Sequence, residues 1–163
     1  MDDSKTQEAA RLLHAAWRDQ QPIPGLPHGC RPQNLDEGYR IQAALAAVHD
    51  VPVAGYKIGA TNEVAQRIFD VDAPFFGRVF APSVLESPAE IAAGTVRLNI
   101  IEAEFDFTLK KDLPAGDGTY SRDEVMAAVD NLHPAIEIPD SRYKNWREAG
   151  MPQLAADNAV AAL

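Results

Sequence analysis

The stretch from residue 96 to residue 109 alternates between apolar and acidic side chains and therefore predicts the longest β-strand of the chain. Its odd positions from 101 onward are apolar, and its even positions carry three carboxylates, Glu102, Glu104 and Asp106. Successive side chains of a strand point to opposite faces, so neighbouring carboxylates project to one side about 7 Å apart. We expect the apolar face to belong to the hydrophobic core.

Two interpretations of the acidic face remain open. The commoner arrangement is the exposed face of a one-sided sheet, where water and salt screen the repulsion between carboxylates. The second interpretation comes from Glu137, which lies inside the apolar segment 134–139, because a glutamate is seldom buried unless it is paired or holds a metal. Carboxylates from two strands, with no His or Cys nearby, would form an all-oxygen site that suits Mg²⁺ or Mn²⁺ better than zinc or copper.

A lysine in an earlier predicted strand, over residues 53–58, is the second candidate. Lys57 lies between Gly55 and Gly59. The ordinary expectation is that its ammonium group extends into solvent. The alternative is that the flanking glycines leave room for a ligand to approach, and that Lys57 holds a substrate carboxylate.

The other elements are predicted from hydrophobic period, capping residues and turn formers. A capping box at Asn34 and Glu37 begins the second helix, and another at Ser121 and Glu124 begins the last. In chain order we expect a helix over 7–17, a loop over 21–33, a helix over 34–50, the strand over 53–58, a helix over 61–69, a loop over 72–77, a strand over 78–80, a turn at 116–118, a helix over 122–132 and a strand over 135–138.

Composition limits the class of protein. The 163 residues are 46% hydrophobic, which is enough for one medium-sized domain with an ordinary core. With 15 basic against 24 acidic residues, the net charge of −9 argues against a nucleic-acid partner. No apolar run approaches a membrane span, and the first residues show no signal-peptide core. A single cysteine, Cys30, allows no internal disulfide, so we expect a cytoplasmic protein.

Several short segments occur together in the order found in one known family. They are Gly-Tyr-Lys-Ile-Gly at 55–59, Val-Asp-Ala-Pro-Phe-Phe-Gly at 71–77, Ile-Glu-Ala-Glu at 101–104, Pro-Ala-Ile-Glu-Ile at 134–138 and Ala-Asp-Asn-Ala at 156–159, preceded by Leu-Asp-Glu-Gly-Tyr-Arg-Ile-Gln at 35–42. Each is unspecific alone, but in register they cover nearly the whole chain. The sequence thus resembles the 2-keto-4-pentenoate hydratase and 4-oxalocrotonate decarboxylase family, a branch of the fumarylacetoacetate hydrolase superfamily.

The resemblance implies a fold and an assembly. It implies an α+β protein in which an N-terminal helical segment, 1–50, precedes the first part of a catalytic mixed β-roll, 51–163, with no independent second domain. Family chains are longer, so we expect a roll that is incomplete at its C-terminus and has an unpaired edge. The resemblance also implies a homo-oligomer that acts inside the cell.

The resemblance also implies an activity. The reaction is the addition of water to the far double bond of a 2-hydroxy-2,4-dienoate, giving a 4-hydroxy-2-oxo acid during the degradation of aromatic compounds. The substrate is a small anionic 2-keto acid whose keto oxygen and carboxylate bind Mg²⁺ or Mn²⁺, which acts as a Lewis acid.

Site residues follow from the same resemblance. It places three glutamates at the metal: Glu102, Glu104 and Glu137. It makes Lys57 the catalytic polar group, which would orient the anionic end of the substrate. Three further residues would hold these ligands in position without touching the metal: Asp140, Ser141 and Arg142.

Departures from the family pattern leave alternatives open. Hydratases of the family often carry an aspartate where this chain has Phe75, which leans slightly towards a 4-oxalocrotonate-type decarboxylase. The short chain also allows a homologue without turnover. A C–C hydrolase of the fumarylacetoacetase type would need a histidine to activate water, and none of the four histidines is well placed for that role: His14, His28, His49 and His133.

Overall fold

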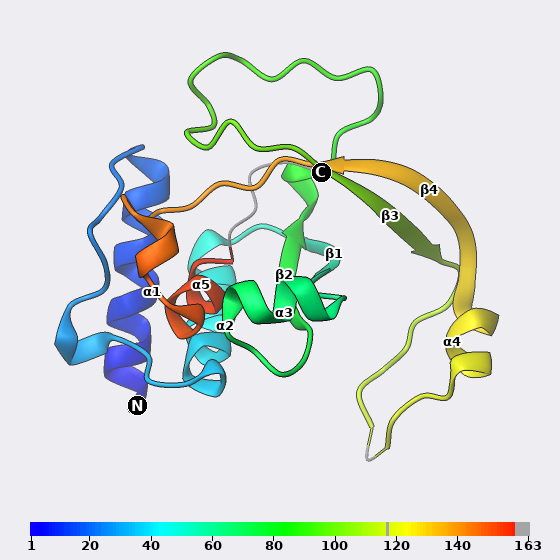
Figure 1. The fold of residues 1–163 in the computed structure, drawn as a ribbon, viewed down its shortest axis with the longest axis horizontal. Helices are drawn as coiled ribbons and strands as arrows, with labels where there is room; N and C mark the ends of the chain where they lie inside the picture. The colour runs from blue at the N-terminus through cyan, green and yellow to red at the C-terminus, as the bar shows by residue number, and fades with distance from the viewer. Residues whose placement is uncertain (117, 159–163) are drawn as a thin grey trace.

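The computed structural model describes residues 1–116 and 118–158, which form a helical body and a two-stranded arm (Figure 1). The body contains α1 (Asp3–Arg18), α2 (Leu35–His49) and α5 (Met151–Asp157). The sheet formed by β1 (Val53–Gly59) and β2 (Phe75–Phe80) belongs to the body, together with α3 (Glu63–Phe69). The arm consists of β3 (Glu102–Leu109), α4 (Arg122–Ala128) and β4 (Val129–Glu137). Short 3₁₀ turns occupy His28–Cys30, Ala81–Ser83 and Trp146–Glu148.

The core lies between the helices of the body, where α1 and α5 pack against α2. Its largest fully buried apolar side chains are Leu13, Leu26, Ile41 and Tyr143. Asn34 caps α2 as predicted, because its side chain accepts a hydrogen bond from the amide of Glu37. The other half of the predicted capping box differs: the Glu37 carboxylate accepts from the amide of Gln33 and from the N-terminal amine rather than from Asn34.

The β1–β2 sheet is antiparallel and begins its pairing earlier than the sequence predicts. Lys57 lies opposite Gly77, and Gly59 lies opposite Phe75. The predicted loop over 72–77 is therefore too long, because pairing with β1 makes residues 75–77 part of β2. The alternation predicted for β1 is confirmed, but the Lys57 side faces inwards while Tyr56 is exposed.

The arm corrects the prediction for the segment after the acidic strand. The Ser121–Glu124 capping box is present, but α4 ends at Ala128 instead of residue 132. Residues 129–137 run along β3 as a strand, in which Leu132 lies opposite Phe107. Pro134 lies opposite Phe105 in a strand that, among the described residues, pairs only with β3, and proline is tolerated in such an edge strand.

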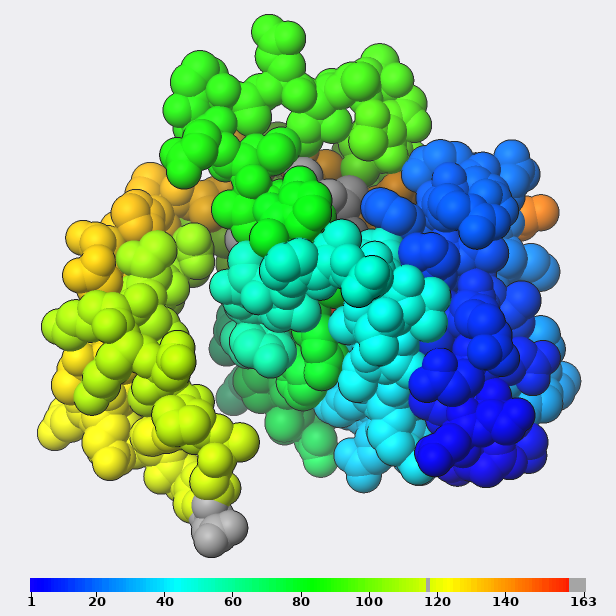
Figure 2. Space-filling model, turned by 180° about the vertical axis from the view of Figure 1, so that it is seen from behind, coloured from blue at the N-terminus to red at the C-terminus, as the bar shows by residue number. Residues whose placement is uncertain are grey.

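The start and the apolar face of β3 also differ from expectation. Residues 96–101 are not in a strand, and the amides of Arg97 and Leu98 donate to the Asp140 carboxylate. The predicted core face is exposed: Ile101 keeps 73% and Phe105 75% of its accessible surface. The physical reason is that no second layer formed by the described residues covers this face, and Figure 2 shows the arm standing away from the body.

The α+β class predicted from the sequence is confirmed. Both sheets are antiparallel and two-stranded, and they remain separate over the described residues. The predicted domain boundary near residue 50 stays a prediction, although α5 from the second segment packs on α2 from the first. Within the described residues, no helix is both long and apolar enough to cross a membrane.

Candidate metal centre

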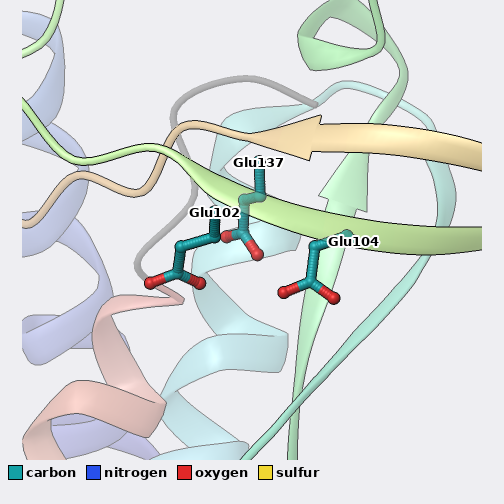
Figure 3. Close-up of side chains that lie close together, drawn as sticks. All are labelled: Glu102, Glu104 and Glu137. Atoms are coloured by element: carbon teal, nitrogen blue, oxygen red, sulfur yellow. The ribbon is translucent and has the colours of Figure 1, made fainter.

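Three glutamates converge at the end of the arm that lies next to the body. Glu102 at the start of β3 lies directly opposite Glu137 at the end of β4, and Glu104 is two residues further along β3. All three side chains point to the same side of the strand pair (Figure 3). One carboxylate oxygen from each lies within 4.8 Å of the others. The structure thus brings together the three glutamates that the resemblance assigns to a metal.

The electrostatics of the cluster are unfavourable for three bare carboxylates. Like charges directly opposite on paired strands destabilise the pairing, and Glu137 is 95% buried. The pKa of Glu102 is raised, first by desolvation and then by repulsion from Glu137, while Lys57 acts in the opposite direction. A cation shared by the three oxygens would remove this repulsion.

Lys57 reaches the cluster from the body. Its Nζ atom lies 2.7 Å from Oε1 of Glu137, so the ion pair joins β1 to β4. The side chain passes over Gly77, where an added Cβ would lie only 2.8 Å from Cε of Lys57. Glycine at position 77 therefore gives the lysine its path, and the ordinary expectation of a solvent-extended ammonium group is not what the structure shows.

Asp106, the third carboxylate of the acidic face, does not join the cluster. It lies further along β3, opposite His133, and it is outside the group of converging oxygens. Alternation alone placed three carboxylates on this face, but the position of Glu137 on the neighbouring strand decides which two of them meet it.

Asp140, Ser141 and Arg142 follow β4 and stabilise the loop behind the cluster. The Asp140 carboxylate accepts hydrogen bonds from the backbone amides of Arg97, Leu98 and Ser141. Among the described residues, no hydrogen bond or ion pair joins these three to the glutamates themselves, although Asp140 and Ser141 border the same cavity. Their support of the metal ligands therefore stays a prediction.

Asp157 is a buried residue to which the sequence interpretation gave no role. It has no exposed surface, and its carboxylate accepts from the Ser141 hydroxyl and the Arg142 amide. The guanidinium Nε of Arg142 lies 3.3 Å from it. Burial raises the pKa of Asp157, and Arg142 opposes that rise. The sequence did contain a signal for this role, because Asp157 is a single aspartate at the end of an alanine-rich segment. An acid buried in such a segment needs partners.

A cavity of about 370 Å³ lies between arm and body beside the three glutamates and Lys57. The aromatic side chains of Phe69 and Phe75 also line it, with ring centroids 5.6 Å apart. Its volume is within the range of small-molecule sites. Asn158, which exchanges hydrogen bonds with the backbone of Arg78, forms part of the wall near α5.

The donor set fits a hard divalent cation. Three carboxylates, one of them buried, meet without a histidine or cysteine among the clustered ligands, which is the ligand chemistry of Mg²⁺ and Mn²⁺. The neighbouring cavity leaves space for a small anion beside the cluster.

Comparison with known proteins identifies the family. No protein-family model matches the chain. However, a 2-hydroxypent-2,4-dienoate hydratase from Pseudomonas putida is 34% identical over 169 residues, which cover all of this chain and 74% of that protein. The chain belongs to the 2-keto-4-pentenoate hydratase and 4-oxalocrotonate decarboxylase family.

Other members of this family match the chain over part of their length. The 2-keto-4-pentenoate hydratase of Paraburkholderia xenovorans (strain LB400) is 33% identical over 162 residues, covering 98% of this chain and 59% of that protein. The chain thus spans about three-fifths of the first curated relatives. A 4-oxalocrotonate decarboxylase from Pseudomonas putida G7, solved with magnesium and adipate, shares the fold with a TM-score of 0.87 at 19% identity, over 99% of this chain and 62% of its own.

Proposed function

We propose that this chain contains the metal-binding part of a hydratase that adds water to a 2-hydroxy-2,4-dienoate and requires Mg²⁺ or Mn²⁺. The observation that carries the proposal is the convergence of Glu102, Glu104 and Glu137 with Lys57 beside one small cavity. The family hydratases described above support the reaction class. We also propose that the two sheets form part of a mixed β-roll of the superfamily type, and that the protein is a homo-oligomer.

In this proposal the chain's own residues bind and orient the acid. Glu102, Glu104 and Glu137 would hold the cation, whose chemical contribution when bound is Lewis-acid polarisation of the 2-oxo group. Lys57 lies beside these ligands and provides positive charge for the substrate carboxylate in a chain of net charge −9. The loop at Asp140 and Ser141 fixes the cavity wall behind them.

The overall reaction conserves atoms and charge without an oxidant or reductant. The proton of the 2-hydroxyl leaves as the ketone forms, C3 and C5 each gain a proton, and C4 gains the hydroxyl of water. The product is a 4-hydroxy-2-oxo acid with the same carboxylate. Fixing that carboxylate at one end of the cavity positions the distant double bond, and such positioning supplies a large share of enzymatic rate enhancement.

Decarboxylation of a 4-oxalocrotonate-type acid is the second candidate. It would use the same glutamates and Lys57, and it is supported by the fold shared with the 4-oxalocrotonate decarboxylase described above. A metal-binding homologue without turnover is the third candidate, since the chain spans about three-fifths of the curated relatives.

The experiment follows the absorbance of 2-hydroxypenta-2,4-dienoate with and without Mg²⁺. We expect metal-dependent loss of absorbance with the natural chain and none with Glu104→Ala. Asp106→Ala is the matched control, since Asp106 lies on the same face outside the cluster, and we expect it to retain activity. The hydratase proposal is contradicted if turnover is the same with and without Mg²⁺, or if the natural chain shows no turnover.

Calorimetric titration with Mn²⁺ tests the ligands separately from turnover. We expect Glu102→Ala to weaken Mn²⁺ binding at least about ten-fold, because one of three clustered carboxylates is lost. Unchanged affinity would remove Glu102 from the ligand set. Intact Mn²⁺ binding without turnover of dienoate or 4-oxalocrotonate would favour the homologue without activity.

A further inference from the structure

Phe75 lies on the same face of the β1–β2 sheet as Lys57. The register pairs Lys57 with Gly77 and Gly59 with Phe75, so the lysine and the phenylalanine are offset by two residues along the strands. Two residues of a strand span about 7 Å. The floor of the cavity therefore carries a cation at one position and an aromatic ring one repeat further on.

The position of the Phe75 ring is fixed by its neighbours. The ring lies on Gly59, where an added Cβ would come within 2.5 Å of its carbon atoms. Phe69 of α3 packs edge-on against it, with an interplanar angle of 78°. Both rings border the cavity, as does Ala65 on the same helix. This end of the cavity thus carries two aromatic rings from two elements, and the polar residues that line it between β1 and α3, Thr61 and Asn62, are uncharged.

Among the described residues, the cavity offers no second positive charge for a ligand. Lys57 is the single Lys or Arg among the described residues that line it, and it lies at the glutamate cluster. A carboxylate placed against Phe69 and Phe75 would lose water without gaining a cationic partner, which is unfavourable.

We infer that Phe75, together with Phe69, sets the substrate specificity of the site: it accepts the hydrocarbon end of a 2-oxo or 2-hydroxydienoic monocarboxylic acid and rejects a second carboxylate. The inference rests on the proposed function, because it assumes that the carboxylate and 2-oxo group lie at the glutamates and Lys57. An extended acid held there directs its far carbon atoms towards the Phe75 ring.

The test compares two saturated ligands that differ only at the far end. 2-Oxohexanoate ends in a methyl group and 2-oxohexanedioate in a carboxylate, and neither has the double bonds needed for water addition. Calorimetry on the full chain with saturating Mn²⁺ measures both affinities. We expect 2-oxohexanoate to bind at least about ten-fold more tightly. Equal or tighter binding of the dicarboxylate overturns the inference and leaves the proposed function standing, whereas no binding of either acid contradicts both.

Variants at position 75 test whether the Phe75 ring causes the preference for 2-oxohexanoate over 2-oxohexanedioate. We expect Phe75→Leu to keep the preference for 2-oxohexanoate, and Phe75→Lys to reduce it at least about ten-fold by giving the far carboxylate a partner. Phe105→Lys is the matched control, because Phe105 is exposed on the arm and outside the cavity, and we expect no change. A Phe75→Lys protein that folds, as judged by circular dichroism, and keeps the full preference removes Phe75 from this role. The two ligands on the natural chain decide the inference even if that variant does not fold.

Discussion

Glycine at position 77 determines where the side chain of Lys57 can lie. Both Gly55 and Gly77 are in the β1–β2 sheet, but an added Cβ meets Lys57 only at position 77 and meets open space at position 55. The two glycines therefore form a natural pair of test positions. Comparing an alanine variant at each position separates an effect on the lysine from a general effect of alanine in a strand.

We predict that Gly77→Ala displaces the Lys57 side chain and weakens binding of 2-oxohexanoate by about ten-fold in the presence of Mn²⁺, because the ammonium group moves from its position. The unfolding midpoint should fall as well, because the added Cβ also meets Cγ of Lys57 and Oδ1 of Asn158, and because Glu137 stays buried without its partner. Calorimetry and thermal unfolding measure the two effects. Gly55→Ala should leave the affinity unchanged, and an equal loss in both variants would contradict the explanation.

At the residue scale, the sequence predicted the glutamates better than their surroundings. The alternation of Glu102 and Glu104 and the apolar context of Glu137 are local features, visible in a few residues. The ion pair between Lys57 and Glu137 joins residues 80 positions apart, and the partners of Asp157 are set by the packing of α5. No short-range pattern encodes such contacts, so they required the structure.

At the scale of elements, buried polar contacts attach α5 to the loop that follows β4. Asp157 at the end of α5 binds Ser141 and Arg142, all three nearly without exposure. Removing one partner of a buried ion pair leaves the other charge desolvated and typically costs about 3–5 kcal/mol. Loss of a hydroxyl that donates to a charged group costs less, about 2 kcal/mol.

We predict that Asp157→Ala lowers the free energy of unfolding by about 3 kcal/mol or more, because Arg142 stays buried without its carboxylate. Ser141→Ala leaves the ion pair in place but removes the hydroxyl that donates to Asp157 and accepts from the Tyr143 amide, and it should cost less, about 2 kcal/mol. Urea unfolding followed by circular dichroism measures both. If the two variants lose the same stability, the buried charge is not the source of the effect.

The sequence also predicted element types better than element ends. The Ser121 capping box located the start of α4, but the helical spacing of Val125, Val129 and Leu132 suggested a helix that ends too late. Pairing with β3 draws residues 129–132 into β4 instead. Short apolar runs fit a helix or a strand, and a partner strand distant in sequence decides between them.

At the scale of the whole molecule, His49 joins three parts of the body. Its ring contacts His14 and Trp17 of α1 and Phe80 of β2, and Nδ1 lies 3.1 Å from Nδ1 of His14. Burial first, and then the charges of His14 and Arg142, lower the pKa of His49 from 6.5 to about 4. Between these pH values the unfolded chain binds more protons than the folded one, so acidification favours unfolding.

We predict that the stability contributed by His49 is fully present above pH 6.5 and is lost as the pH falls towards 4. The temperature at which the natural chain unfolds should therefore be lower at pH 5 than at pH 7. His49→Phe keeps an aromatic ring without a titrating group and should show a smaller fall over the same interval. An identical pH dependence in both proteins would exclude His49 as the cause.

The cavity borders both the body and the arm, which Figure 1 shows as two parts of the molecule. Glu102, Glu104 and Glu137 come from the arm, and Lys57 and Phe75 come from the body. A molecule bound there touches both and acts as a reversible cross-link. Limited proteolysis should therefore cleave β3 and β4 more slowly once Mn²⁺ and a 2-oxo acid are added together, because ligand binding to the folded form reduces opening. In this protein, occupying the site and holding the arm in place would be a single event.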